Sequence, residues 1–172
     1  PGHLPITVLV EAKDDPIPDP LNLNFVVPLE LGTEALDRID TEIRSVFPRE
    51  QLIVPDDVRG SFLTLELAVL TQGWPRLSEA RGKIMFALDN TDDTRDNYIA
   101  GHPSLQGRVL FTDSPAGTPE AAFMKRNDPL ANPGDIASLV AQGYMVRTRA
   151  DADTVQARSG DTTQRDAALS SG

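Results

Sequence analysis

The chain contains no cysteine and only two histidines, His3 and His102, among its 172 residues. Without a thiol, disulfide bonds and thiolate metal sites are excluded. Both histidines precede predicted strands, whereas the chemistry of parallel (β/α) folds lies where the strands end. We therefore expect structural roles for both, and no Ser–His–Asp or Cys–His arrangement can be built.

Long apolar runs are lacking too, since each is far shorter than the roughly 20 residues that a membrane-spanning helix needs. Acidic residues outnumber basic ones by 26 to 16, which gives a net charge of −10. This charge argues against a nucleic-acid-binding surface and disfavours unspecific adhesion to anionic membranes. A length of 172 residues with 40% hydrophobic residues suits one globular domain over 1–172.

Strand-length apolar runs alternate with helical patterns along the chain. A proline-rich segment follows the first run and excludes a helix there, and residues 89–97, rich in Asp, Asn and Thr, are expected to form a loop. Thr33, Thr64 and Asn132 are the expected N-caps. The predicted strands are 6–12, 83–89, 108–112, 121–126 and 144–149, and the predicted helices are 33–47, 64–72, 133–142 and 162–170.

A glycine-rich turn after the first strand is also missing. Open doubly wound sheets usually carry a phosphate-binding turn there, but here Asp14, Asp15 and several prolines follow. A closed (β/α)8 barrel needs eight strands and about 250 residues, which is more than this chain offers. We therefore predict an α/β fold that is a partial TIM-type (β/α) barrel, with unpaired outer strands.

Charged side chains stand at the end of each predicted strand, directly after its apolar run. In a (β/α) barrel the site lies at the C-terminal ends of the strands, so charge at this position indicates a charged ligand at the barrel mouth. These residues are Glu11, Lys13, Asp14 and Asp15 after the run 6–10, Asp89 after 84–88, Asp113 after 109–112, Lys125, Arg126 and Asp128 after 121–124, and Arg147, Arg149, Asp151 and Asp153 after 144–146.

The alternation of side chains along a strand decides which of these charges share a face. In the first strand Ile6, Val8 and Val10 form an apolar face for the helices, so Glu11 and Lys13 are expected to point into the barrel. The same alternation applied to the other strands gives one predicted constellation, with Glu11, Asp89 and Asp113 as carboxylates and Lys13, Lys125, Arg147 and Arg149 as cations.

The residue types in this constellation favour a phosphate ester. Carboxylates are hard oxygen ligands for calcium or magnesium, and guanidinium groups match phosphate oxygens in bidentate geometry. A metal ion and several cations around one cavity stabilise the charge that develops on a phosphate ester. A structural alternative remains open, because inward Lys, Arg and Glu side chains also pair with one another, and Asp89 and Asp113 also fit loop-capping roles.

Several segments together resemble a known family. They are ITVLVEAKDD (6–15), LIVPDDVRG (52–60), GWPRLSEARGKIMFALDN (73–90), GHPSLQGRVLF (101–111), KRNDP (125–129), YMVRTRADADT (144–154) and SGDTTQRDAA (159–168). Over essentially all 172 residues the chain resembles the bacterial calcium-dependent phosphoinositide-specific phospholipase C family, which has a TIM-type barrel.

The resemblance implies a reaction and a set of roles. Such enzymes cleave phosphatidylinositol or a related phosphodiester lipid into diacylglycerol and inositol phosphate, with two catalytic histidines and a Ca2+ ion, and they contact the membrane surface peripherally. Glu11 matches the last calcium ligand, at the end of the family's third strand, and Lys13 matches a lysine that lines the site. Lys125, Arg147, Arg149 and Asp89 are the remaining expected substrate-binding residues.

The family's catalytic histidines and its other calcium ligands all precede the region matched here. By resemblance the chain therefore covers strands 3 to 7 of eight, holds no catalytic residue and is expected to be inactive alone. Its full-length parent is expected to be secreted. Two alternatives stay open, a glycerophosphodiester phosphodiesterase and a non-catalytic module that binds phosphate or a lipid head group.

Overall fold

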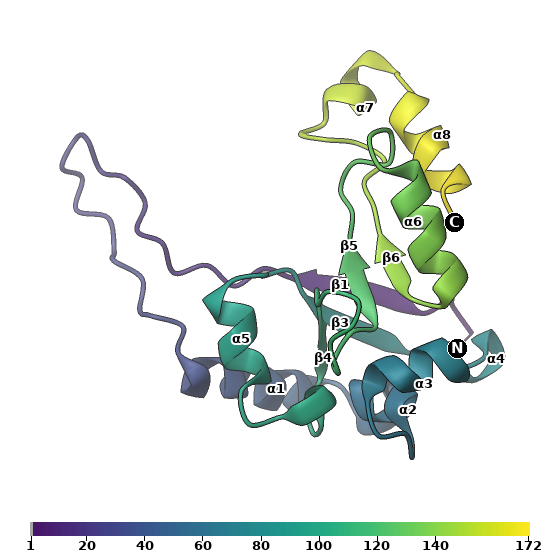
Figure 1. Cartoon of the computed structure of the whole chain (residues 1–172). Coiled ribbons are helices and arrows are strands. Elements are labelled where there is room, and N and C mark those ends of the chain that lie inside the picture. The colour runs from purple at the N-terminus through teal and green to yellow at the C-terminus, as the bar shows by residue number, and fades with distance from the viewer. Residues whose placement is uncertain (1) are drawn as a thin grey trace.

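A computed structural model describes residues 2–172. Its parallel strands form a four-stranded sheet of β1, β2, β3 and β4 and a two-stranded sheet of β5 and β6 (Figure 1). β1 pairs with β3 along its whole length, β3 continues to β4, a parallel bridge between Asp113 and Phe123 joins β4 to β5, and β5 pairs with β6. The bounds are β1 Ile6–Val10, β2 Leu52–Ile53, β3 Ile84–Leu88, β4 Leu110–Thr112, β5 Phe123–Lys125 and β6 Met145–Arg147, with the short β2 pairing with the start of β3.

Helices connect these strands. Figure 1 shows α1, α2 and α3 along one side of the sheet and α6 beside β6. The bounds are α1 Thr33–Val46, α2 Pro55–Arg59, α3 Leu65–Thr71, α4 Leu77–Ala80, α5 Asp93–Ile99, α6 Pro133–Gln142, α7 Val155–Ser159 and α8 Thr163–Ser170, with short 3-10 turns at Arg49–Gln51 and Pro103–Leu105. Within residues 2–172 we find no helix with the length and apolar character needed to cross a membrane.

The four predicted helices are confirmed as α1, α3, α6 and α8, and local interactions explain where some of them begin and end. The side chain of Thr64 caps α3 by accepting a hydrogen bond of 3.0 Å from the backbone N–H of Leu67. α6 begins at Pro133 and ends before Gly143, which adopts a left-handed φ of 107°. One predicted cap is wrong, because Gly32 and not Thr33 occupies the N-cap of α1.

The predicted loop over 89–97 is also wrong in its second half, where α5 begins. Asp92 caps this helix by accepting a 3.0 Å hydrogen bond from the backbone N–H of Thr94. The helix is short and polar, and Tyr98 is its one buried residue, so the sequence carries no apolar periodicity that could have indicated it.

Opposite faces of the sheet pack against different partners. Phe86 of β3 contacts Phe47, at the end of α1, with ring centroids 5.6 Å apart. Its neighbour Ala87 is in register with Phe111 of β4, and Phe111 packs against Trp74 with centroids 5.2 Å apart. Side chains therefore alternate along β3, with Phe86 towards α1 and Ala87 away from it, as expected of a strand.

The sheet curls around this second face. Thr7 of β1, Met85 of β3 and Met145 of β6 all line one apolar pocket of about 160 Å³. Trp74 closes the same pocket, and its indole Nε1 donates a 3.0 Å hydrogen bond to the carbonyl oxygen of Gly143, just before β6. β1 and β6 thus approach each other at their N-terminal ends.

A buried polar network ties α1 and α5 to the start of β4. The hydroxyl of Tyr98 donates to Asp40 Oδ1 at 2.5 Å and accepts from the backbone N–H of Leu110 at 2.9 Å. Arg108 lies 4.3 Å above the Tyr98 ring and forms ion pairs with Asp37 and Asp40. This network lies beside the N-terminal end of β4, away from the charged residues that follow the strands.

Candidate functional site

Glu11 and Lys13 follow directly after β1. Alternation along the first strand predicted that both side chains point into the barrel. Glu11 Oε1 lies 3.1 Å from Lys13 Nζ, and the two side chains are 53% and 68% exposed. An ion pair this exposed contributes little to stability. Both groups are therefore accessible to a ligand.

An asparagine that the sequence analysis did not single out fixes the chain after β1. The side chain of Asn90 accepts from the backbone N–H of Ala12 at 2.9 Å and donates to the carbonyl oxygen of Ala12 at 3.0 Å. One residue earlier, the N–H of Asp89 donates to the carbonyl oxygen of Val10 at 2.8 Å. Asn90 thereby extends the pairing of β1 and β3 beyond the strands and places Glu11 beside Asp89.

Asp89 and Lys125 form the best-enclosed ion pair among the predicted site residues. Lys125 Nζ lies 2.9 Å from Asp89 Oδ1 and donates to the Asp89 carbonyl oxygen at 2.7 Å. Their side chains are only 16% and 19% exposed. The contact at Oδ1 is therefore a charge-assisted one with little access to water.

Asp113 lies beneath this pair in a structural position. It is buried, and its Oδ1 accepts a 3.0 Å hydrogen bond from the backbone N–H of Lys125. This bond continues the bridge between β4 and β5 past the point where β4 ends. Asp113 thus fits the loop-capping alternative and positions Lys125.

Arg147 and Arg149 follow on the last strand and are half-buried. Arg147 is in register with Lys125 and donates to the side-chain oxygen of Asn127, which the sequence analysis did not single out. The carbonyl oxygen of Arg149 accepts from Gln164 Nε2 of α8 at 3.1 Å. Lys125 and Arg147 therefore form a cationic pair of neighbours at the end of β5 and β6.

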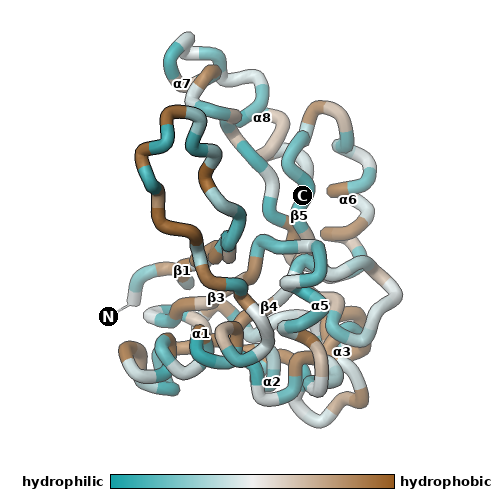
Figure 2. Tube along the Cα trace, turned by 90° about the vertical axis from the view of Figure 1, so that its left-hand side faces the viewer, coloured by the Kyte–Doolittle hydropathy of each residue, from teal (hydrophilic) through white to brown (hydrophobic). Residues whose placement is uncertain are grey.

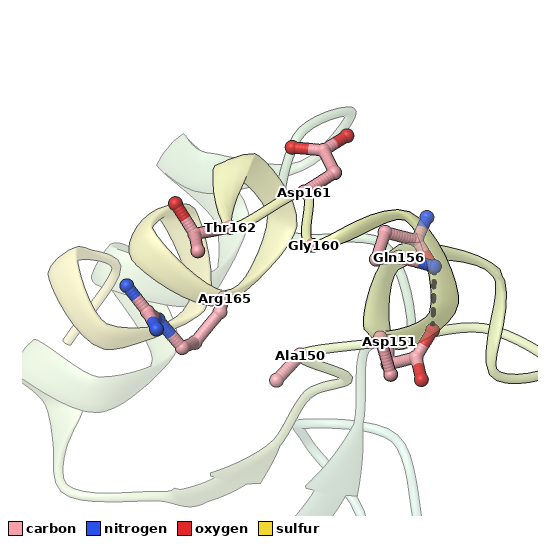
Figure 3. Close-up of a pocket in the computed structure, with 8 residues that line it drawn as sticks. Ala150, Asp151, Gln156, Gly160, Asp161, Thr162 and Arg165 are labelled. Carbon is pink, nitrogen blue, oxygen red and sulfur yellow. Dashed lines mark hydrogen bonds between the residues drawn. The ribbon is translucent and has the colours of Figure 1, made fainter.

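A pocket of about 270 Å³ lies beyond β6, between α7 and α8 (Figure 3). Asp151 Oδ1 closes one wall by accepting from the backbone N–H of Gln156 at 3.1 Å. Hydrogen bonds from Thr163 lower the pKa of Asp161 below its usual range, and the bond from Arg165 lowers that of Asp166. The lining residues are Ala150, Asp151, Gln156, Ala157, Gly160, Asp161, Thr162 and Arg165.

The residues present do not form a complete calcium site. Calcium takes six to eight oxygen ligands, whereas residues 2–172 bring together no group of three Asp, Glu, His or Cys side chains that could hold a metal ion. Glu11 is an accessible carboxylate, but the cation beside it is the ammonium of Lys13. Glu11 by itself therefore supplies at most one side of a metal site.

The structure thus divides the predicted constellation into two parts. Asp89, Lys125 and Arg147 adjoin one another, and Glu11 and Lys13 pair with each other one strand away. Within residues 2–172 no ion pair joins Glu11 or Lys13 to Lys125 or to the two arginines.

The sequence model described as "Phosphoinositide phospholipase C, Ca2+-dependent" matches residues 1–172. The chain belongs to this family. The expected family membership is therefore confirmed, and the family depends on calcium. No curated protein matches the chain.

Solved bacterial structures show the same fold. A calcium-dependent phosphoinositol-specific phospholipase C from Pseudomonas sp., described as an apo form and a myoinositol complex, is 15% identical, with a TM-score of 0.59 over 94% of this chain and 57% of that one. A Ca2+-dependent phosphatidylinositol-specific phospholipase C from Streptomyces antibioticus is 20% identical, with a TM-score of 0.60 over 85% of this chain and 52% of that one.

This phospholipase C family chain spans little more than half the length of the solved structures that it matches. Its fold is α/β with parallel strands, as predicted. The family match over residues 1–172 includes both parts of the candidate site.

Proposed function

We propose that this chain is the strand 3 to 7 portion of a phosphoinositide phospholipase C barrel and forms a single domain over 1–172. Lys125, Arg147 and Arg149 would bind the phosphate of the inositol head group, with Asp89 holding Lys125 in place and Lys13 lining the site. The observation that carries this proposal is the register that sets Lys125 beside Arg147 and next to Asp89. Two neighbouring cations at strand ends match the anionic oxygens of a phosphodiester.

The proposed reaction is cleavage of phosphatidylinositol to diacylglycerol and inositol phosphate. Glu11 would contribute one calcium ligand, and the remaining ligands and the catalytic histidines would come from outside this chain. The incomplete metal site and the partial coverage of the solved relatives support this division. We therefore expect residues 1–172 to be inactive alone.

The test compares this chain with the complete protein on phosphatidylinositol, with and without calcium. We expect hydrolysis by the complete protein only. In that protein, Glu11→Gln should raise the calcium concentration needed for half-maximal activity at least about tenfold, because one anionic ligand is lost. Arg147→Met should raise KM for the lipid without changing the calcium requirement. The control is Arg38→Met, which removes the exposed ion pair with Glu34 on α1 at 2.5 Å.

Cleavage of glycerophosphodiesters in place of phosphatidylinositol would move the assignment to a glycerophosphodiester phosphodiesterase. Binding of inositol phosphate without any hydrolysis would identify a non-catalytic head-group module. Hydrolysis that is indifferent to both Glu11→Gln and Arg147→Met would overturn the assigned roles.

A further inference from the structure

Four polar residues in a row, at positions 125–128, span the end of β5 and reach four different partners. The chain turns hydrophilic at this point (Figure 2). Successive side chains of an extended segment point in different directions, so neighbours in sequence meet different groups. The pairings are Lys125 with Asp89, Arg126 with Asp135, Asn127 with Arg147, and Asp128 with the backbone N–H groups of Leu130 and Ala131.

The two neighbouring cations of the candidate site have partners of different charge. Lys125 Nζ lies 2.9 Å from a carboxylate oxygen of Asp89, so its positive charge is largely balanced within the protein. The guanidinium of Arg147, in register with Lys125, donates from Nη1 to the amide oxygen of Asn127. An amide oxygen accepts a hydrogen bond but carries no net charge. Asn127 therefore orients Arg147 without neutralising it.

The carboxylate next to Asn127 in the sequence is used elsewhere. Asp128 Oδ1 accepts hydrogen bonds from the backbone N–H groups of Leu130 and Ala131, both at 3.0 Å. These bonds form the turn that leads into α6. The turn thus occupies the carboxylate, and the uncharged member of the pair Asn127-Asp128 is the one that meets Arg147.

The backbone and the neighbouring helix hold Asn127 in this position. The N–H of Arg126 donates to the carbonyl oxygen of Arg147 at 2.8 Å, which continues the hydrogen bonding between β5 and β6 past Lys125. The ion pair of Arg126 with Asp135, at 2.5 Å, ties the same segment to α6. Asn127 and Arg147 are both half-buried. Since the segment is fixed on two sides, the amide is preorganised for the guanidinium.

Other arginines of low exposure have charged partners. Arg59, Arg95, Arg108 and Arg126 are buried or half-buried, and each lies 2.5–2.8 Å from a carboxylate oxygen. Cations that are withdrawn from water are usually paired in this way. Arg147 differs from these four in donating to a neutral oxygen, which suits a guanidinium whose anion is a ligand.

We propose that Asn127 is a positioning residue that determines anion binding by Arg147, because its amide oxygen aims the guanidinium and leaves the positive charge to a phosphate group. The inference rests on the proposed function, in which Arg147 binds the phosphate of the inositol head group. An aspartate at position 127 would keep the hydrogen bond, but it would balance the charge of Arg147 and repel an anion. The site therefore requires a neutral acceptor at position 127, and a hydrogen bond alone is not sufficient.

The test measures calorimetric binding of soluble inositol phosphate and thermal unfolding, for the complete protein and two variants of it. Asn127→Asp should weaken binding at least about tenfold, because it places a second anion beside the phosphate. The same variant should unfold at an equal or higher temperature, since its bond with Arg147 becomes charge-assisted on both sides. Asn127→Ala should weaken binding less and lower Tm by about 2 °C, because the acceptor is lost while the charge of Arg147 is kept. The two variants should therefore rank in opposite order for affinity and for stability, which a purely structural role of Asn127 would not produce.

The matched control is Asn97→Asp, the same change at an exposed position of α5. Its neighbour Tyr98 contacts the N–H of Leu110 at the start of β4, so the added charge lies at the opposite end of the strands and should leave binding unchanged. Equal affinity of Asn127→Asp and the unaltered protein would overturn the proposal, and so would the same ranking of the two variants in affinity and stability. If the unaltered protein fails to bind inositol phosphate, or if Arg147→Met binds it equally well, the proposed function itself fails.

Discussion

At the scale of single residues, the candidate site balances structure against binding. Lys125 is held by the Asp89 carboxylate and by its carbonyl oxygen, so a phosphate must share this ammonium with groups already in place. Within residues 2–172, the only ion pair of Glu11 and of Lys13 is the one between them, and both side chains are more than half exposed. A ligand of Glu11 or Lys13 therefore has to break only one exposed ion pair. A ligand of Lys125 binds an ammonium that keeps its contacts with Asp89.

Tyr98 gives a pH-dependent prediction at the same scale. Burial raises its pKa well above the usual value, and the charge and hydrogen bond of Asp40 raise it further. The folded protein therefore keeps the Tyr98 proton at a pH where the unfolded chain loses it. Its stabilising effect is present in full below about pH 10 and falls as the pH rises beyond that value, by about 1.4 kcal/mol per pH unit.

Urea unfolding at a series of alkaline pH values checks this expectation. Tyr98→Phe should lower the free energy of unfolding near neutral pH by about 1–3 kcal/mol, because Asp40 and the Leu110 N–H lose a partner. The same variant should show a shallower decline above about pH 10. An identical alkaline slope in both proteins would contradict the assignment.

At the scale of elements, the turn between α6 and β6 sets the position of Arg147. Gly143 combines a φ of +107° with close packing, since a Cβ atom added there would lie 2.9 Å from the carbonyl oxygen of Val69. Its own carbonyl oxygen accepts the hydrogen bond from Trp74. Any side chain at this position therefore strains the backbone and pushes α3 and α6 apart.

We predict that Gly143→Ala lowers the free energy of unfolding by about 2–4 kcal/mol, from left-handed strain together with the clash. The matched control is Gly160→Ala, at a φ of +70° with nothing within 4 Å of the added Cβ. It should cost about 1–2 kcal/mol, which is the strain alone. Thermal and chemical unfolding of both variants measures the difference, and equal losses would show that the contact with Val69 is unimportant.

Much of this element layout could be predicted because apolar periodicity is strong where helices and strands face the core. In α1, Leu36 and Ile43 recur at helical spacing and are buried, and in β3 alternation indicated which residues meet α1. The elements that the sequence analysis missed, β2, α2, α4, α5 and α7, have two to seven residues each. Such short segments are decided by capping and tertiary contacts.

The residues of the candidate site, too, could be predicted only where a sequence pattern marks them. Its charged members could be found because they stand at the ends of recognisable strands. Asn90 and Asn127 could not, because their roles depend on hydrogen bonds to Ala12 and Arg147, residues 78 and 20 positions away. An amide side chain carries no sequence signal of the distant group that it will bind.

At the scale of the whole molecule, the strands differ in how many neighbours they have. β3 has partners on both sides, whereas β1 pairs with β3 alone within residues 2–172. Residues 6 and 7 of β1 are exposed, while residues 85–88 of β3 are buried. Opening of β1 therefore breaks one ladder and exposes only the half-buried Val8, Leu9 and Val10, whereas opening of β3 exposes fully buried residues.

We predict that the amide hydrogens of β1 exchange with solvent at least about tenfold faster than those of β3, because β1 opens locally and β3 exchanges through larger unfolding events. Hydrogen exchange followed by mass spectrometry or NMR distinguishes the two strands. Equal protection would mean that β1 is held on its second edge as well, for instance by another copy of the chain.

The pairing of β1 with β3 also sets a minimum delay between the synthesis of β1 and its pairing with β3. Ile6 is in register with Ile84, so a ribosome that has finished the first strand must add 78 more residues before its partner exists. At ordinary rates of synthesis this takes about 4–16 s, and until then the edge of Ile6–Val10 that pairs with β3 has no partner. Among the strand pairings within residues 2–172, this one spans the longest stretch of chain and so leaves its edge open to chaperones for the longest time.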